Sequence, residues 1–141
     1  MTTSVLARPP DRIERADVTV MERSTVDDLA HIQELWASFE ELVGLHGRKM
    51  YACVDTDAGT YTTCTPVRDD DDAAAMGLTV GTLRGGRYLR GRLVGEPPDV
   101  YALIAPGMDE LIALATRDTS RPLVEFYRRR DEIDLWVPVT W

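Results

Sequence analysis

Residues 25–44, TVDDLAHIQELWASFEELVG, decide how this chain folds. The apolar positions in this stretch recur at intervals of three and four residues, which places them on one face of a helix. They are Val26, Leu29, Ile32, Leu35, Trp36, Phe39, Leu42 and Val43. Thr25, followed three residues later by Asp28, is typical of a helix N-cap, and Gly44 is typical of a helix end. We therefore predict an amphipathic helix over residues 26–43.

Runs of β-forming residues flank this helix on both sides. Before it, residues 17–23 alternate apolar and polar side chains, which indicates a strand. After it, residues 49–55 and 60–67 are two β-prone runs separated by residues 56–59, TDAG, whose composition is typical of a hairpin turn. The first half of the chain is therefore predicted to be β-α-β-β.

The second half of the chain has the same predicted order. Its first strand is expected over residues 78–82 and 87–94, with a break at Gly85-Gly86 that indicates a bulge or a tight turn. The other two strands are expected at residues 123–128 and 133–139. A helical stripe over residues 99–114 is interrupted at Pro106, so we expect either one kinked helix or two short ones.

Two β-α-β-β units, over about residues 13–67 and 76–139, predict an α+β fold in which an antiparallel sheet carries two helices with pseudo-twofold symmetry. Interfaces between repeats are natural concavities, so a ligand groove is expected between the halves. The length of 141 residues suits one domain, which we place at residues 13–141. Residues 1–12 are rich in proline and poor in apolar side chains, and are expected to form a flexible tail.

Composition excludes several classes of partner. The formal charge of −8 repels phosphate backbones and anionic membranes, so neither nucleic acid nor a membrane is expected as a partner. No apolar run approaches the ~18 residues that a spanning helix needs, and no signal peptide is recognisable, so we expect a cytoplasmic protein. The acidic residues 69–72 repel one another, which predicts a solvated loop. Consecutive aspartates cannot all reach one calcium ion.

Few residues suit metal or nucleophilic chemistry. Cys53 and Cys64 could lie on adjacent strands, but a cytoplasmic chain keeps thiols reduced, and two cysteines without a spaced histidine do not make a zinc site. We predict buried structural thiols. His31 and His46 fall near the two ends of the predicted helix and are expected to be capping or solvated. Because no phosphate loop or nucleophile elbow is present either, we expect no metal and no cofactor.

The residues best suited to function are 123–127, LVEFY. In a strand, Leu123, Glu125 and Tyr127 point to the same face, so a carboxylate lies among apolar and aromatic neighbours. Desolvation there raises the pKa of Glu125 unless a hydrogen bond or a cation compensates. Such a group attracts a cationic ligand or donates a proton. The alternative is a surface strand residue, or the partner of an arginine such as Arg128.

A groove around Glu125 would be lined by aromatic side chains, which bind flat or cationic molecules by stacking and cation–π contact. The candidate ligand-binding residues are Glu125, Trp36, Phe39, Tyr61, Tyr88, Tyr127 and Trp136. The alternative is that these aromatic side chains form an ordinary hydrophobic core.

Four short segments occur in a characteristic order within the β-α-β-β frame. They are residues 32–39 (IQELWASF), 86–88 (GRY), 122–127 (PLVEFY) and 133–139 (IDLWVPV). Together they resemble the GyrI-like small-molecule-binding family, also called the effector-binding domain of AraC-type and multidrug-responsive transcription regulators. The resemblance extends over about residues 13–139.

The resemblance implies a two-repeat fold whose groove takes hydrophobic, often cationic, aromatic compounds, with Glu125 as its acidic floor. About a dozen residues precede the first strand and leave no room for a helix-turn-helix, so a stand-alone member that senses or sequesters drugs or toxins is expected. One alternative is a hydrolase of electrophilic cyclopropane-type natural products, with Glu125 as general acid or base and Tyr127 or Tyr61 as its partner. A second is a protein–protein inhibitor, such as a gyrase inhibitor.

Overall fold

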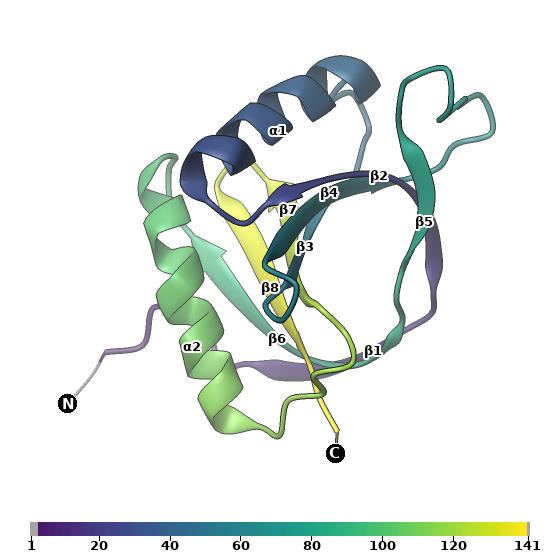
Figure 1. Cartoon of the computed structure of the whole chain (residues 1–141). Coiled ribbons are helices and arrows are strands. Elements are labelled where there is room, and N and C mark those ends of the chain that lie inside the picture. The colour runs from purple at the N-terminus through teal and green to yellow at the C-terminus, as the bar shows by residue number, and fades with distance from the viewer. Residues whose placement is uncertain (1–2, 141) are drawn as a thin grey trace.

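A computed structural model of the chain describes residues 3–140, in which eight strands form one antiparallel sheet and two α-helices cover one of its faces (Figure 1). The strands are β1 (Asp11–Arg15), β2 (Val18–Val26), β3 (Met50–Asp55), β4 (Thr60–Pro66), β5 (Thr79–Leu83), β6 (Gly86–Val94), β7 (Leu123–Arg129) and β8 (Glu132–Pro138). The helices are α1 (Leu29–Val43), η1 (Asp99–Leu103, a 3-10 helix) and α2 (Ile104–Leu114). The predicted α+β fold is confirmed.

The sheet order, β1-β6-β8-β7-β3-β4-β2-β5, contains the two predicted units. The unit β2-α1-β3-β4 contributes the neighbouring strands β3-β4-β2, and the unit β6-α2-β7-β8 contributes β7-β8-β6 in the mirrored order. The two central strands, β3 and β7, are antiparallel neighbours, with Ala52 opposite Glu125. The pseudo-twofold axis therefore passes between β3 and β7, at the middle of the sheet.

Each half of the sheet is completed by a strand from the other half of the chain. The strand β1, which precedes β2, pairs with β6, and β5, which precedes β6, pairs with β2. The two connections meet at Gly85, whose N–H donates to Asp17 Oδ1 at 2.6 Å. A Cβ on Gly85 would lie 2.3 Å from the Arg15 carbonyl oxygen, so only glycine fits this crossing.

The first residues of the chain differ from the prediction. The strand β1 begins at Asp11, within the segment 1–12 that the sequence predicts to be a flexible tail. Upstream of it, the Ala7 N–H donates to the Arg92 carbonyl oxygen at 2.8 Å, and Leu6 packs against the core beneath α2. A five-residue edge strand next to two prolines gives a weak period-two pattern, which explains why β1 was not predicted.

Helix α1 starts three residues later than predicted. Its N-cap is Asp28, whose side chain accepts a hydrogen bond from the His31 N–H at 3.0 Å. The prediction of Thr25 as the N-cap is wrong, because Thr25 still belongs to β2, where it pairs with Tyr61 of β4. Gly44, with φ of 73°, ends the helix as predicted.

Helix α2 follows η1 directly and has Pro106 in its first turn. A proline is tolerated there because the N–H that it lacks would have no partner within the helix, so Pro106 does not divide α2. A Cβ on Gly107 would lie 2.8 Å from Leu135 Cδ1, so this glycine lets α2 approach β8 closely. Within residues 3–140, no helix has the length and apolar character needed to cross a membrane.

The sheet curls (Figure 1). Its two faces bury separate clusters of side chains. On the helix face, α1 packs on β2 and β4, and α2 packs on β6 and β8. The opposite face, called the inner face below, holds a cluster of buried side chains from seven strands, β2 to β8. They are Val20, Tyr51, Cys64, Leu83, Tyr88, Val124 and Trp136. A residue's position in the two-residue alternation of its strand therefore decides which core it joins.

The acidic residues 69–72 lie in the loop between β4 and β5, as predicted. One of them, Asp71, differs from the prediction because its side chain is not solvated. Its carboxylate accepts two hydrogen bonds from the Arg48 guanidinium, at 2.6 and 2.7 Å, and the side chain is 3% exposed. The hydrogen bonds from Arg48 lower the pKa of Asp71 to about 2. This bidentate pair attaches the loop to the segment that follows α1.

Candidate functional site

Glu125 lies on the helix face of β7, at the centre of the sheet. It pairs in register with Ala52 of β3 and Leu135 of β8, and it is only 5% exposed. The predicted alternation of β7 is confirmed, because Tyr127 reaches Glu125 by a hydrogen bond while Val124 belongs to the inner-face core. Among residues 3–140, no ion pair includes Glu125, so the alternatives of a surface residue or an arginine partner do not hold.

Two tyrosine hydroxyls hold the Glu125 carboxylate. The hydroxyls of Tyr61 and Tyr127 donate to Oε1 of Glu125 at 2.8 and 2.6 Å, and they lie 3.2 Å from each other. The indole N–H of Trp36, on α1, donates to the Tyr61 hydroxyl at 3.0 Å. Both donors to Glu125 reach the same oxygen. No group in the described part of the chain donates to Oε2, which leaves one carboxylate oxygen able to accept from a ligand.

Burial dominates the electrostatics of this cluster. Desolvation raises the pKa of Glu125, the hydrogen bonds from Tyr127 and Tyr61 oppose that rise, and the charge of Asp27 adds to it. Desolvation also raises the pKa of Tyr61 and Tyr127, with Glu125 contributing, so both hydroxyls stay protonated and remain donors. An ionised Glu125 is therefore a buried negative charge that is hydrogen-bonded but not neutralised, which is an unfavourable state unless a cation joins it.

Replacing Glu125 with glutamine is expected to stabilise the protein at neutral pH. A raised pKa in the folded state means that the folded chain binds more protons than the unfolded chain, so the wild type loses stability as pH rises above about 4.5, the ordinary value. Thermal unfolding should therefore show a higher Tm for Glu125→Gln at pH 7 and a smaller difference at pH 4. Glu41→Gln, an exposed change on α1, should alter Tm little. A lower Tm for Glu125→Gln at pH 7 would contradict the unfavourable burial.

The structure brings together only part of the predicted aromatic set. Trp36, Tyr61 and Tyr127 surround Glu125, and the rings of Trp36 and Tyr127 meet edge to face at 4.9 Å. Phe39 is next to Trp36, but it is fully buried with Met21 and Met50 and anchors α1.

Tyr88 and Trp136 lie on the inner face, on the other side of the sheet from Glu125. Trp136 follows Leu135, the register partner of Glu125, by one residue, so its side chain points away from Glu125. The structure therefore does not bring these two residues into one groove with Glu125. Their position depends on strand register, which the sequence pattern does not reveal.

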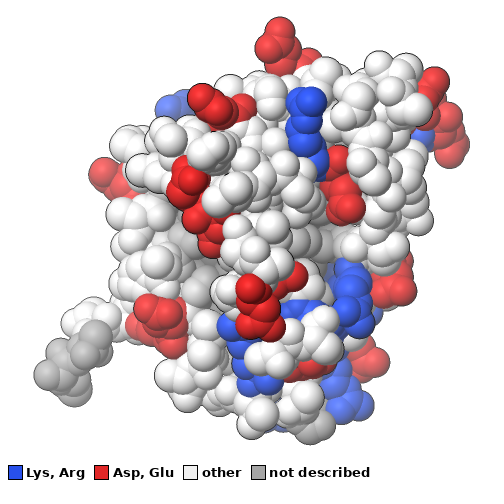
Figure 2. All heavy atoms as spheres, viewed as in Figure 1, with Lys and Arg blue, Asp and Glu red and all other residues white. Residues whose placement is uncertain are grey.

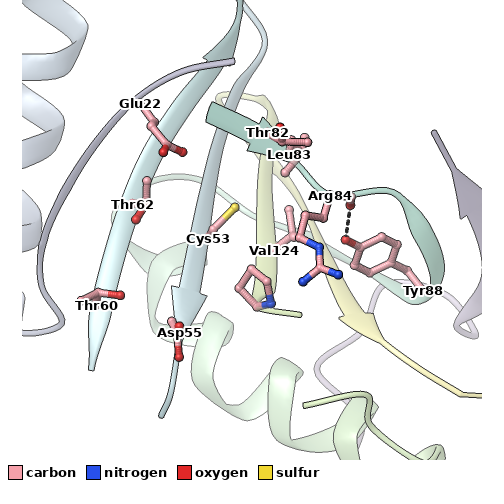
Figure 3. Close-up of a pocket in the computed structure, with 11 residues that line it drawn as sticks. Glu22, Cys53, Asp55, Thr60, Thr62, Thr82, Leu83, Arg84, Tyr88 and Val124 are labelled. Carbon is pink, nitrogen blue, oxygen red and sulfur yellow. Dashed lines mark hydrogen bonds between the residues drawn. The ribbon is translucent and has the colours of Figure 1, made fainter. Parts of the chain in front are cut away.

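A pocket that the sequence did not predict opens on the inner face (Figure 3). Its volume is about 180 Å³. It is lined by Glu22, Cys53, Asp55, Thr60, Thr62, Thr82, Leu83, Arg84, Tyr88, Pro122 and Val124. A second pocket lies near the end of α2, beside Leu89 and Leu114. Glu125 lines neither of them, because Trp36, Tyr61 and Tyr127 fill the space around its carboxylate.

Comparison with known proteins identifies the fold. No protein-family model and no curated protein matches this sequence. Among solved structures, an integron cassette protein from the mobile metagenome of Vibrio cholerae is similar with a TM-score of 0.73 and 15% identity, over 93% of this chain and 95% of that chain. The protein SAV2435, solved with tetraphenylphosphonium bound, has a TM-score of 0.65 and 16% identity over 94% of each chain.

A hydrolase from Listeria innocua has a TM-score of 0.56 and 14% identity, over 94% of this chain and 92% of that chain. At sequence identities this low, the structural similarity establishes a shared fold over nearly the whole length and nothing about function. Function has to be argued from the residues of the site.

Proposed function

We propose that this protein is a GyrI-like small-molecule-binding protein that takes aromatic organic cations at Glu125. The observation that carries the proposal is a buried carboxylate with two tyrosine donors on one oxygen, no partner on the other and no neutralising cation among the described residues. The protein SAV2435 shares this fold and binds tetraphenylphosphonium, an ion of the chemical class that such a site attracts.

The interactions available to a bound cation come from charge and from aromatic faces. A positive charge next to ionised Glu125 interacts strongly because the surroundings are apolar and screen it little. The rings of Trp36 and Tyr127 offer further cation–π and stacking contacts. The net charge of −8 attracts cations at longer range, and acidic side chains are spread over the face shown in Figure 2.

Access to Glu125 requires Trp36 to move. Trp36 is partly exposed and closes the cluster from the α1 side, where its indole N–H donates to the Tyr61 hydroxyl. Three side chains of α1 are buried, Leu35, Phe39 and Val43, and they keep the helix attached while Trp36 changes rotamer. In the bound state the ligand's ring would replace the indole over Tyr127 and face Oε2 of Glu125.

The test compares two ligands of the same shape and opposite charge. Isothermal titration calorimetry at pH 7.5 should show binding of tetraphenylphosphonium and at least tenfold weaker binding of tetraphenylborate, since only the cation is attracted to Glu125. Equal affinities would mean that the site recognises aromatic surface alone, and no binding of either ion would refute the proposal.

A second candidate function is hydrolysis, favoured by two tyrosine donors on a carboxylate whose pKa is raised. In this function Glu125 takes a proton from water that attacks an electrophilic cyclopropane, and a tyrosine hydroxyl stabilises the developing negative charge. Product formation in excess over protein would support it. Stoichiometric uptake without product would leave only the binding function.

A further inference from the structure

The chain's only two cysteines are neighbours on the inner face. Cys53 of β3 pairs in register with Thr62 of β4, and Cys64 pairs with Tyr51. The cysteines are therefore diagonal neighbours on the same face of adjacent antiparallel strands. Both are free thiols, and Cys53 packs against the buried cluster that includes Cys64. Two thiols at diagonal positions on one face of adjacent strands form a pair that one atom can bridge.

One of these thiols opens to the inner-face pocket. Figure 3 shows the Cys53 sulfur among the residues that line the pocket, which include the apolar side chains of Leu83 and Val124. Cys64 is 1% exposed and does not itself line the pocket. The side chain of Glu22 also lines the pocket, and its carboxylate is in no ion pair within residues 3–140. The volume of about 180 Å³ accommodates a single-ring organic group.

We propose that this pocket is a dithiol binding site for trivalent arsenicals that carry one organic group, with the arsenic bridging Cys53 Sγ and Cys64 Sγ and the organic group in the pocket. Thiolates select soft centres. A structural zinc ion needs four ligands, and within residues 3–140 no third His, Cys, Asp or Glu is placed to complete a metal site. A trivalent arsenic with one organic group has two bonds left, which two thiols satisfy.

The binding step is a condensation without a change in oxidation state. In the hydrated arsenical two As–O bonds break and two As–S bonds form. The two thiol protons leave with the hydroxyl groups as two molecules of water. Cys53 reacts first because it faces the pocket, and Cys64 closes the ring. Glu22 beside the pocket offers a carboxylate that accepts the Cys53 proton and passes it to the departing hydroxyl.

The probe is phenylarsine oxide, added to the full chain kept reduced with a phosphine. In excess glutathione, a monothiol, the wild type should retain one phenylarsenic group per chain by intact mass spectrometry, and 2,3-dimercaptopropanol should remove it. Cys53→Ser and Cys64→Ser should each lose at least tenfold in retention, because a single thiol exchanges with glutathione. No retention by the wild type, or equal retention by either variant, would overturn the proposal.

A second measurement does not depend on the variants. Titration of thiols after unfolding, with and without the arsenical, should show two thiols lost for each arsenical bound, whereas the loss of one thiol for each arsenical would overturn the bridging geometry. The site is also separate from Glu125. Glu125→Gln should retain phenylarsine oxide as the wild type does, and tetraphenylphosphonium should not displace it, since the two sites lie on opposite faces of the sheet. Failure of either proposal therefore leaves the other intact.

Discussion

Glu125→Gln is expected to lower the affinity for tetraphenylphosphonium by about 10- to 100-fold at pH 7.5. The substitution keeps the size of the side chain and an oxygen that accepts from Tyr61 and Tyr127, and it removes only the negative charge. An interaction with a charged partner contributes about 1.5–3 kcal/mol, and each 1.4 kcal/mol is a factor of ten in affinity. Calorimetry on the wild type and the variant gives this ratio directly.

The matched control is Glu40→Gln, which removes the same charge from α1. Burial raises the pKa of Glu40 too, but its side chain is not part of the Glu125 cluster, so the affinity for tetraphenylphosphonium should stay within about twofold of the wild type. Equal affinity of Glu125→Gln and the wild type would show that Glu125 does not hold the cation.

The affinity should also depend on pH in a defined direction. Because its pKa is raised, Glu125 is neutral at acidic pH, and a cation binds better once the carboxyl ionises. The wild-type affinity should therefore rise with pH and level off once Glu125 is ionised in the free protein. In Glu125→Gln this pH-dependent rise should be absent.

Phe39→Ala is expected to have the largest effect on stability, about 3–5 kcal/mol in the free energy of unfolding. Phe39 is fully buried between α1 and the sheet, where it packs with Met21, Val43 and Met50. Such a loss is a large fraction of the total free energy of unfolding of a typical domain, which is about 5–15 kcal/mol. Urea unfolding followed by circular dichroism measures it.

Leu29→Ala is the control on the same helix. Leu29 is 72% exposed at the start of α1, so its truncation should change the free energy of unfolding by less than about 0.5 kcal/mol. Equal destabilisation of the two variants would contradict the conclusion that Phe39 attaches α1 to the sheet. This comparison also tests whether Phe39 serves the core, as its burial indicates, or the ligand site.

Local patterns in the sequence predicted most of the secondary structure. The helical stripe predicted α1, and the alternation in residues 123–127 correctly placed Glu125 and Tyr127 on one face of β7. These properties depend on neighbouring residues in the chain. The prediction of Thr25 as the N-cap is wrong because threonine is also common in strands. The pairing of Thr25 with Tyr61 is a long-range contact that no local pattern in the sequence indicates.

Features that depend on strand pairing could not be predicted. Tyr88 and Trp136 are predicted to line a groove with Glu125 because aromatic rings suit flat or cationic ligands, but a shift of one residue in register decides the face on which a side chain lies. The burial of Asp71 depends on Arg48, which lies 23 residues earlier in the chain. The inner-face pocket is built from β2 to β7 and has no signature within any one segment.

The exchange of edge strands has a consequence for synthesis of the chain. β1 leaves the ribosome early, but its partner β6 follows much later, since Asp11 contacts Arg90 across 79 residues. The segment β2-α1-β3-β4 likewise waits for β5 to cover its edge. Until then, nascent chains expose unpaired strand edges, which are sites of intermolecular pairing. Folding therefore has to wait until most of the chain has been translated, and a ribosome that stalls after β4 releases a fragment prone to aggregate.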